Sequence, residues 1–138
     1  MTRFLDTNIL LRHLVPDEPE KALACRALLL RLESGEETVV TSDLVILETV
    51  FVLQSRRQYG LSRERICQLL EPLVNLRGLR LPRKSLYSRV FDLYRNNSVS
   101  FADAYNVAFM EARGLTEVYS YDTDFDRVAG ISRVEPEQ

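Results

Sequence analysis

The sequence has few of the side chains on which nucleophile or zinc catalysis usually depends. It has one histidine, His13, and two cysteines, Cys25 and Cys67, which lie far apart. Neither cysteine has metal-ligand neighbours in the sequence, so we expect both to be reduced structural thiols. His13 has no nucleophile motif beside it, so we expect a surface or packing role. Ser-His-Asp and Cys-His catalysis are therefore unsupported.

The chain also lacks segments that would send it to a membrane or divide it. It has no N-terminal segment with a basic start and an apolar core, and no run of about 18 apolar residues. Repeats, low-complexity tracts and Gly-rich phosphate loops are absent. With 138 residues, 46% of them hydrophobic, it can bury roughly two thirds of its unfolded surface. We expect one domain spanning residues 1–138, in the cytoplasm.

Hydrophobic patterning predicts strands that alternate with helices. The predicted strands span residues 2–5, 38–41, 79–81, 117–121 and 131–134. The predicted helices span residues 9–15, 17–32, 43–59, 62–76, 83–96 and 100–112, and residues 122–128 form a short turn or helix. Strands separated by helices predict an α/β fold, with a central, mostly parallel sheet flanked by helices on both faces.

Capping residues refine the helix limits. Ser42, Ser62 and Ser100 are expected N-caps, because a serine hydroxyl can accept a hydrogen bond from a free N–H of the first turn. Gly60 is expected to close the helix over 43–59. Pro72 is expected to kink the helix over 62–76 or to end it early.

Four acidic residues stand inside or beside apolar segments. Asp6 and Asp122 directly follow predicted strands, and Glu48 and Asp103 lie early in apolar helices. Ionised acids are rarely buried unless they are paired or bind a metal, and too few basic residues lie nearby in sequence to pair all four. Ligands of parallel sheets bind at the carboxyl ends of the strands. We therefore expect these four acids to form one site, and oxygen-only ligands favour Mg²⁺ or Mn²⁺ over zinc.

A divalent ion held by such acids can activate water and offset charge on a phosphate, and this chemistry suggests a role for each acid. Asp6, Asp103 and Asp122 are expected to bind metal directly or through water, and Glu48 to bind metal or to orient the attacking water. An isolated aspartate at position 6 would also suit a helix cap. The residues expected to support these acids by hydrogen bonding are Thr7, Asn8 and Ser42.

Two further acids follow the last strong strand. Asp124 is two residues from Asp122, and we leave open whether it binds metal or caps a helix. Asp126 is expected to belong to a charged helix start with Arg127 as its counterion.

The acidic residues lie in motifs that resemble those of a known family. The motifs are Phe4-Leu5-Asp6-Thr7-Asn8-Ile9-Leu10, the helical Glu48, Phe101-Ala102-Asp103-Ala104, and Ser120-Tyr121-Asp122-Thr123-Asp124-Phe125. In this order they resemble the acidic motifs of PIN domains, and the small bacterial toxins of the VapC type most of all. The resemblance covers essentially the whole chain. It implies a ribonuclease dependent on Mg²⁺ or Mn²⁺ that is the toxin of a type II toxin–antitoxin pair.

The same resemblance implies protein partners. A small antitoxin would lay a peptide across the acidic site, where an Arg or Lys could pair with the carboxylates. The apolar helical hairpin after Pro16 would serve a homodimer interface.

Basic residues are concentrated in the middle of the sequence. Residues 54–95 carry ten basic and three acidic side chains, whereas the rest of the chain carries eight and 17. Such a segment can hold a phosphate backbone or can simply form a solvated face. The residues expected to bind nucleic acid are Arg56, Arg57, Arg83 and Lys84. Tyr59, Tyr87 and Tyr94 lie in the same segment and could stack bases, although core packing is expected for Tyr94.

Two other classes of function stay open at this point. A PIN-like interaction module would keep the fold without metal chemistry, but binding alone does not require a repulsive cluster of carboxylates. Another Mg²⁺-dependent phosphate-ester hydrolase is the second class. A haloacid-dehalogenase-like phosphatase would carry Asp-x-Asp after its first strand, and here Asn8 stands at the second position.

Overall fold

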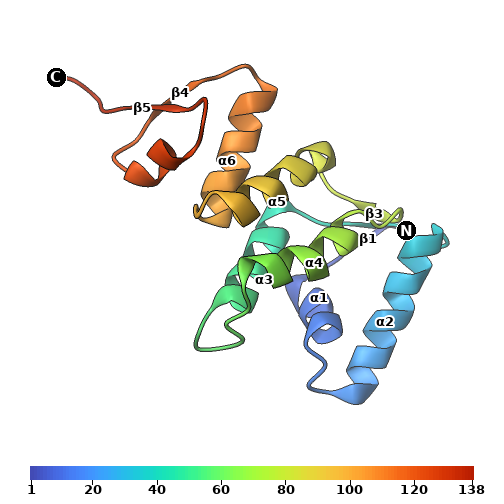
Figure 1. The fold of residues 1–138 in the computed structure, drawn as a ribbon. Coiled ribbons are helices and arrows are strands. Elements are labelled where there is room, and N and C mark those ends of the chain that lie inside the picture. The colour runs from blue at the N-terminus through green and yellow to red at the C-terminus, as the bar shows by residue number, and fades with distance from the viewer. The chain divides into compact units, whose positions relative to one another are not determined.

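Short parallel strands and helices alternate along the chain in the computed structural model, which describes all 138 residues (Figure 1). The predicted α/β class is confirmed. The strands fall into two sheets, and the chain divides into two units, Met1–Lys84 and Ser85–Gln138. The expectation of one domain over residues 1–138 stays a prediction. None of the helices is long and apolar enough to cross a membrane.

The first unit contains a three-stranded parallel sheet in the order β1-β2-β3. Its strands are β1 (Arg3–Phe4), β2 (Val39–Val40) and β3 (Leu79–Arg80). Gly78 lets the chain before β3 pack closely against the segment before β2. A Cβ at this position would lie only 2.1 Å from the carbonyl oxygen of Glu37. The three strands bring the segments after Phe4, Val40 and Arg80 to the same edge of the sheet.

Four helices complete the first unit: α1 (Thr7–Leu14), α2 (Pro19–Ser34), α3 (Asp43–Gln54) and α4 (Arg63–Val74). Their core includes Leu10, Ile46, Leu53, Ile66 and Leu70, each at most 1% exposed. Ser42 and Ser62 accept hydrogen bonds from Val45 and Arg65 N–H groups, so both predicted N-caps are confirmed. Both cysteines are buried free thiols, as predicted.

The second unit follows a 3₁₀ turn, η1 (Lys84–Leu86). Its elements are α5 (Tyr87–Asn96), α6 (Phe101–Ala112), β4 (Glu117–Tyr119), the 3₁₀ helix η2 (Thr123–Arg127) and β5 (Ser132–Val134). Strands β4 and β5 pair in parallel. Aromatic rings hold α5 against α6, with the Phe101 ring centroid 5.6 Å from that of Phe91 and 5.4 Å from that of Tyr94. The expectation that Tyr94 packs in the core is confirmed.

Two predicted helix limits are wrong. The helix predicted over 43–59 ends at Gln54, because the chain turns at Ser55, whose carbonyl accepts hydrogen bonds from the N–H groups of Gln58, Tyr59 and Gly60. The helix predicted over 83–96 begins at Tyr87 after the 3₁₀ turn, since Arg83 has a φ of 53°, which is incompatible with a right-handed helix. Pro72 lies inside α4, which continues to Val74, two residues short of the predicted end.

Candidate metal centre and active site

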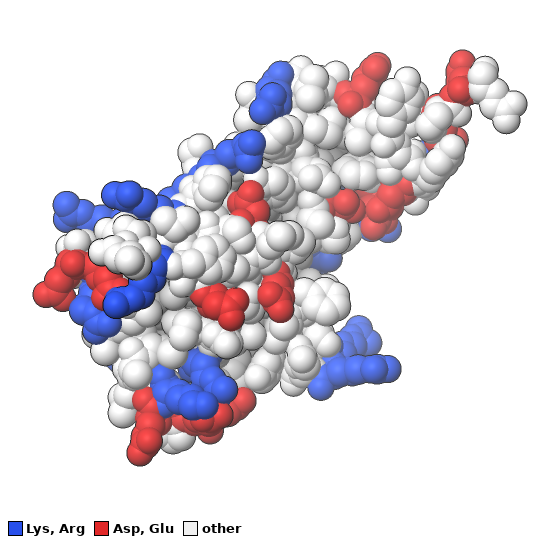
Figure 2. Space-filling view, turned by 180° about the vertical axis from the view of Figure 1, so that it is seen from behind, with Lys and Arg blue, Asp and Glu red and all other residues white.

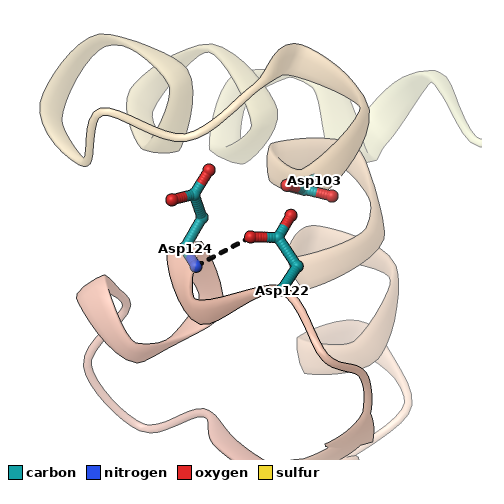
Figure 3. Close-up of side chains that lie close together, drawn as sticks. All are labelled: Asp103, Asp122 and Asp124. Carbon is teal, nitrogen blue, oxygen red and sulfur yellow. Dashed lines mark hydrogen bonds between the residues drawn. The ribbon is translucent and has the colours of Figure 1, made fainter.

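Three aspartates of the second unit form an acidic cluster, which we define as Asp103, Asp122 and Asp124. One carboxylate oxygen from each lies within 4.8 Å of the others. Asp103 is carried by the first turn of α6, Asp122 directly precedes η2, and Asp124 lies within it. Figure 3 shows the three side chains gathered between α6 and η2. The cluster thus joins two segments that are distant in the sequence.

Local hydrogen bonds fix the main chain under each of these side chains. The Ser100 hydroxyl caps α6 by accepting the Asp103 N–H at 3.0 Å. The Ser120 hydroxyl accepts the Asp122 N–H at 2.9 Å, and the Asp122 carboxylate accepts the Asp124 N–H at 2.9 Å (Figure 3). Each aspartate therefore has its backbone anchored by a neighbouring side-chain oxygen. Asp122 acts as a cap and as a member of the cluster at once.

The negative charges of the acidic cluster act on one another, and their effect is visible at Asp103. Partial burial raises the pKa of Asp103, and the charge of Asp122 raises it further. A hydrogen bond from Ser100 acts in the opposite direction. A carboxyl group that is desolvated beside another carboxylate gains most from a bound cation.

Arg127 forms an ion pair with a member of the acidic cluster, and the partner predicted for it from the sequence is wrong. Arg127 pairs with Asp124 at 2.9 Å and donates to the Ser98 carbonyl at 3.0 Å. Asp126, the expected partner of Arg127, is paired instead with Arg133 at 3.2 Å. The i, i+3 spacing of Asp124 and Arg127 in a 3₁₀ helix was the signal that could have found this pair, because such residues eclipse one another.

The first unit holds the other predicted acids. Asp6 follows β1 at the N-cap position of α1, but its side chain makes no capping hydrogen bond and is exposed to solvent. The neighbouring Thr7 is 5% exposed, and its hydroxyl donates to the Glu48 carboxylate at 2.9 Å. Thr7 therefore links the start of α1 to α3, beside Asp6. Capping does not account for Asp6.

The other two predicted supporting residues have identified positions. Ser42 accepts the Val45 N–H and so serves as the N-cap of α3, the helix that carries Glu48. Asn8 is exposed and lines a pocket of about 220 Å³ with Arg12, Asp17 and Tyr59. The expectation that Ser42 and Asn8 support the carboxylates by hydrogen bonding stays a prediction.

The basic residues of the segment 54–95 have different surroundings. Arg56, Arg57 and Arg83 are exposed. Lys84 is half-buried, and its ammonium group donates to the carbonyls of Leu76 and Leu79 at 2.8 Å each, while burial lowers its pKa. In Figure 2 several blue basic and red acidic groups lie side by side, and most of the face between them is uncharged.

The donor set of the acidic cluster fits a hard divalent cation. It offers carboxylate oxygens from three residues and no nitrogen or sulfur, which suits Mg²⁺ and Mn²⁺ and not zinc. The 4.8 Å limit on the oxygen–oxygen separations allows the three oxygens to approach one ion with small side-chain movements, since Mg²⁺–O distances are about 2.1 Å. Such a group can position an ion for hydrolysis of a phosphate ester.

Comparison with known proteins identifies the family. The sequence matches no curated protein. A crystal structure of Mycobacterium tuberculosis VapC20, described as a sarcin-ricin loop cleaving toxin, is 22% identical and covers 98% of this chain and 100% of its own, with a TM-score of 0.37. That score is too low to support an argument about this chain. The model of the PIN domain family, a family of nucleases, matches residues 3–131. The chain therefore belongs to the PIN domain family.

Proposed function

We propose that this protein is an endoribonuclease that depends on Mg²⁺ or Mn²⁺ and hydrolyses RNA phosphodiester bonds. The observation that carries the proposal is the acidic cluster, in which oxygens of Asp103, Asp122 and Asp124 lie within 4.8 Å of one another in a PIN domain. A cluster of like charges is costly to maintain without a cation. Asp122 and Asp124 lie in the segment that follows β4, which agrees with the rule that ligands of parallel strands bind at their carboxyl ends.

The side chains of the chain have separate tasks in this proposal. Asp103, Asp122 and Asp124 hold the ion, which when bound activates water and offsets charge on the phosphate. Asp6 contributes a further oxygen ligand. Glu48 accepts a hydrogen bond from the attacking water and thereby orients its oxygen toward phosphorus, while the hydroxyl of Thr7 fixes the Glu48 carboxylate.

The reaction itself is a displacement at phosphorus. The water loses a proton as its oxygen forms a bond to phosphorus, the bond from phosphorus to the leaving ribose oxygen breaks, and the leaving oxygen gains a proton in exchange. That Asp6 and Glu48 of the first unit act together with the acidic cluster of the second stays a prediction from the sequence. A metal titration tests it, because Asp6→Asn should weaken Mn²⁺ binding as Asp103→Asn does.

We further propose that the protein is the toxin of a type II toxin–antitoxin pair, acting on RNA in the cytoplasm. The support is the resemblance of its ordered acidic motifs to VapC-type toxins. A small antitoxin would inhibit it by presenting an Arg or Lys to the carboxylates. A homodimer would form through the helical hairpin of α1 and α2, where Leu23 and Leu30 are 68% and 54% exposed.

Two experiments test these proposals separately. Purified protein should cut single-stranded RNA with Mg²⁺ or Mn²⁺ and should stop when a chelator is added. Expression of the protein alone should arrest growth, Asp6→Asn should abolish the arrest, and co-expression of a small gene adjacent to its own should restore growth. Cleavage without growth arrest would leave the nuclease and reject the toxin. Absence of both would favour a non-catalytic interaction module.

A further inference from the structure

A pocket of about 520 Å³ opens between the end of α3 and the start of α4. Every residue that lines it belongs to the first unit. Its wall includes an aromatic ring, an amide and two guanidinium groups, from Phe51, Gln54, Arg56 and Arg63. Phe51 is 72% exposed, so its ring presents an open face.

Main-chain hydrogen bonds give the pocket a defined wall. The carbonyl of Ser55 accepts N–H groups from Gln58, Tyr59 and Gly60 at 2.8 to 3.0 Å, which curls the segment back on itself. Gly60 supports this turn with a φ of +56°. The Leu61 N–H then returns to the Leu53 carbonyl at 2.9 Å. Because these bonds lie within the connection, the pocket is formed before any ligand arrives.

The pocket continues the helix face that carries Glu48. Residues three and seven positions after a given residue lie on its face of a helix, which places Phe51 and Ser55 in line with Glu48. At 1.5 Å of rise per residue, Phe51 lies about 4.5 Å and Ser55 about 10.5 Å further along the axis. Stacked nucleotides follow one another at about 3.4 Å along a strand. The pocket therefore lies within a few nucleotides of Glu48.

We propose that this pocket is a nucleotide subsite, in which one unpaired RNA base stacks on Phe51 while its flanking phosphates pair with Arg56 and Arg63. The subsite rests on the proposed ribonuclease function and adds a point of base recognition within a few nucleotides of Glu48. Stacking on an exposed ring and guanidinium contacts to phosphate are the two features by which proteins hold single-stranded RNA. The amide of Gln54 can donate to and accept from a base edge, which gives the subsite a preference among bases.

Binding can be measured apart from cleavage. The assay uses Asp103→Asn protein without divalent metal and follows the fluorescence anisotropy of a labelled RNA hexamer. Phe51→Leu, which removes the ring but keeps an apolar side chain, should weaken binding about fivefold or more. Phe51→Tyr should restore it. Arg56→Gln should weaken binding and reduce the dependence of log K on log salt by about 0.7.

The matched control is Arg65→Gln. Arg65 lies two residues from Arg63 on α4, is exposed, and does not line the pocket. Arg65→Gln removes the same charge as Arg56→Gln, but from α4 outside the pocket, and it should change the salt dependence less than Arg56→Gln does. Equal effects of Arg56→Gln and Arg65→Gln, together with unaltered binding by Phe51→Leu, would overturn the subsite.

A second readout locates the ligand and separates this proposal from the nuclease function. Titration of wild-type protein with adenosine and uridine monophosphates should shift the amide NMR signals of residues 51–63. If wild-type protein cuts RNA but these signals and the Phe51→Leu affinity are unchanged, the subsite is wrong and the nuclease stands. If the nucleotides shift these signals but no RNA is cut, the subsite stands and the nuclease is wrong. If neither occurs, both are wrong.

Discussion

The hydroxyl of Thr7 donates a 2.9 Å hydrogen bond to the carboxylate of Glu48, 41 residues further along the chain. Thr7 is buried, whereas Asp6 directly before it is exposed at the end of β1. The bond leaves the second oxygen of Glu48 available to water or metal. This hydrogen bond from Thr7 therefore sets the direction of the Glu48 carboxylate, which is a proposed catalytic group.

Thr7→Val should reduce RNA cleavage about tenfold while the protein remains folded. Valine has nearly the same shape but no hydroxyl, so Glu48 loses its fixed orientation and the attacking water is less well placed. The loss of this hydrogen bond to a charged group should also lower the free energy of unfolding by about 1 to 2 kcal/mol. Steady-state cleavage rates and urea unfolding measure the two effects.

Thr49→Val is the control for that variant. Thr49 is fully buried on α3, the helix that carries Glu48. Its hydroxyl donates to the Val45 carbonyl at 2.7 Å and not to Glu48. It should cost about 1 kcal/mol of stability and leave the cleavage rate at the wild-type level. An equal loss of activity in both variants would show that Thr7 acts only through stability.

The three aspartates of the acidic cluster should contribute unequally to metal binding. Asp124 already pairs with Arg127 at 2.9 Å, so less of its charge is available to an ion. Asp103→Asn and Asp122→Asn should each weaken Mn²⁺ binding by at least about tenfold, and Asp124→Asn by less. Isothermal titration calorimetry gives the three affinities, and a larger loss for Asp124→Asn than for the other two would contradict this order.

Removal of an acid from the cluster should also relieve repulsion in the metal-free protein. Asp103→Asn keeps the size of the side chain and removes a partly buried charge next to Asp122. The apo variant should melt at the wild-type temperature or higher, and it should gain less stability from Mg²⁺. A lower melting temperature in the absence of metal would mean that Asp103 has a structural role that outweighs repulsion.

Local sequence features predicted the elements well, and the misses have physical causes. Residues 55–59 are Ser-Arg-Arg-Gln-Tyr, a polar segment without an apolar pattern to distinguish a helix from a turn, and the turn is favoured by three N–H groups that share the Ser55 carbonyl. Arg83 is in the left-handed region, which no propensity for arginine indicates. These departures depend on main-chain hydrogen bonding and not on side-chain type.

The sequence predicted only part of the candidate site. The cluster of Asp103 with Asp122 follows from the rule that helix starts and strand ends meet at one edge of a parallel sheet. The pairing of Arg127 with Asp124 uses an i, i+3 spacing, which brings side chains together in the 3₁₀ helix η2 as it does in an α-helix. The sequence favours Asp126, the direct neighbour of Arg127, as its partner, and that expectation is wrong.

Lys84 should matter more for stability than for RNA binding. Its ammonium group holds the carbonyls of Leu76 and Leu79, which fixes the turn between α4 and β3. Lys84→Gln cannot donate to both carbonyls at the same distances, and it should lower the free energy of unfolding by about 1 to 3 kcal/mol. Urea unfolding measures the loss. Unchanged stability combined with weaker RNA binding would assign Lys84 to the nucleic-acid surface instead.

The second unit should lose a small part of its stability in acid. Arg89 forms two hydrogen bonds to Glu111, at 2.8 and 3.0 Å, and these lower the Glu111 pKa from its ordinary value of 4.5. Because the folded pKa is the lower one, the contribution is complete above about pH 4.5 and is lost as the pH falls through the folded pKa. The pair is partly exposed, so the contribution is below about 1 kcal/mol. Urea unfolding from pH 6 to pH 3 should show this loss in the wild type and not in Glu111→Gln.

Cleavage of a single-stranded RNA by wild-type protein and by Asp122→Asn, with a small phosphate ester as the competing substrate, tests the central claim most directly. With Mg²⁺ or Mn²⁺ the wild type should cut the RNA internally and leave the ester intact, and chelation should stop the reaction. Asp122→Asn should be inactive although it is folded. Cleavage of the RNA by Asp122→Asn at the wild-type rate, cleavage in the presence of chelator, or hydrolysis of the small ester in preference to RNA would contradict the assignment of the acidic cluster as the metal centre of a ribonuclease.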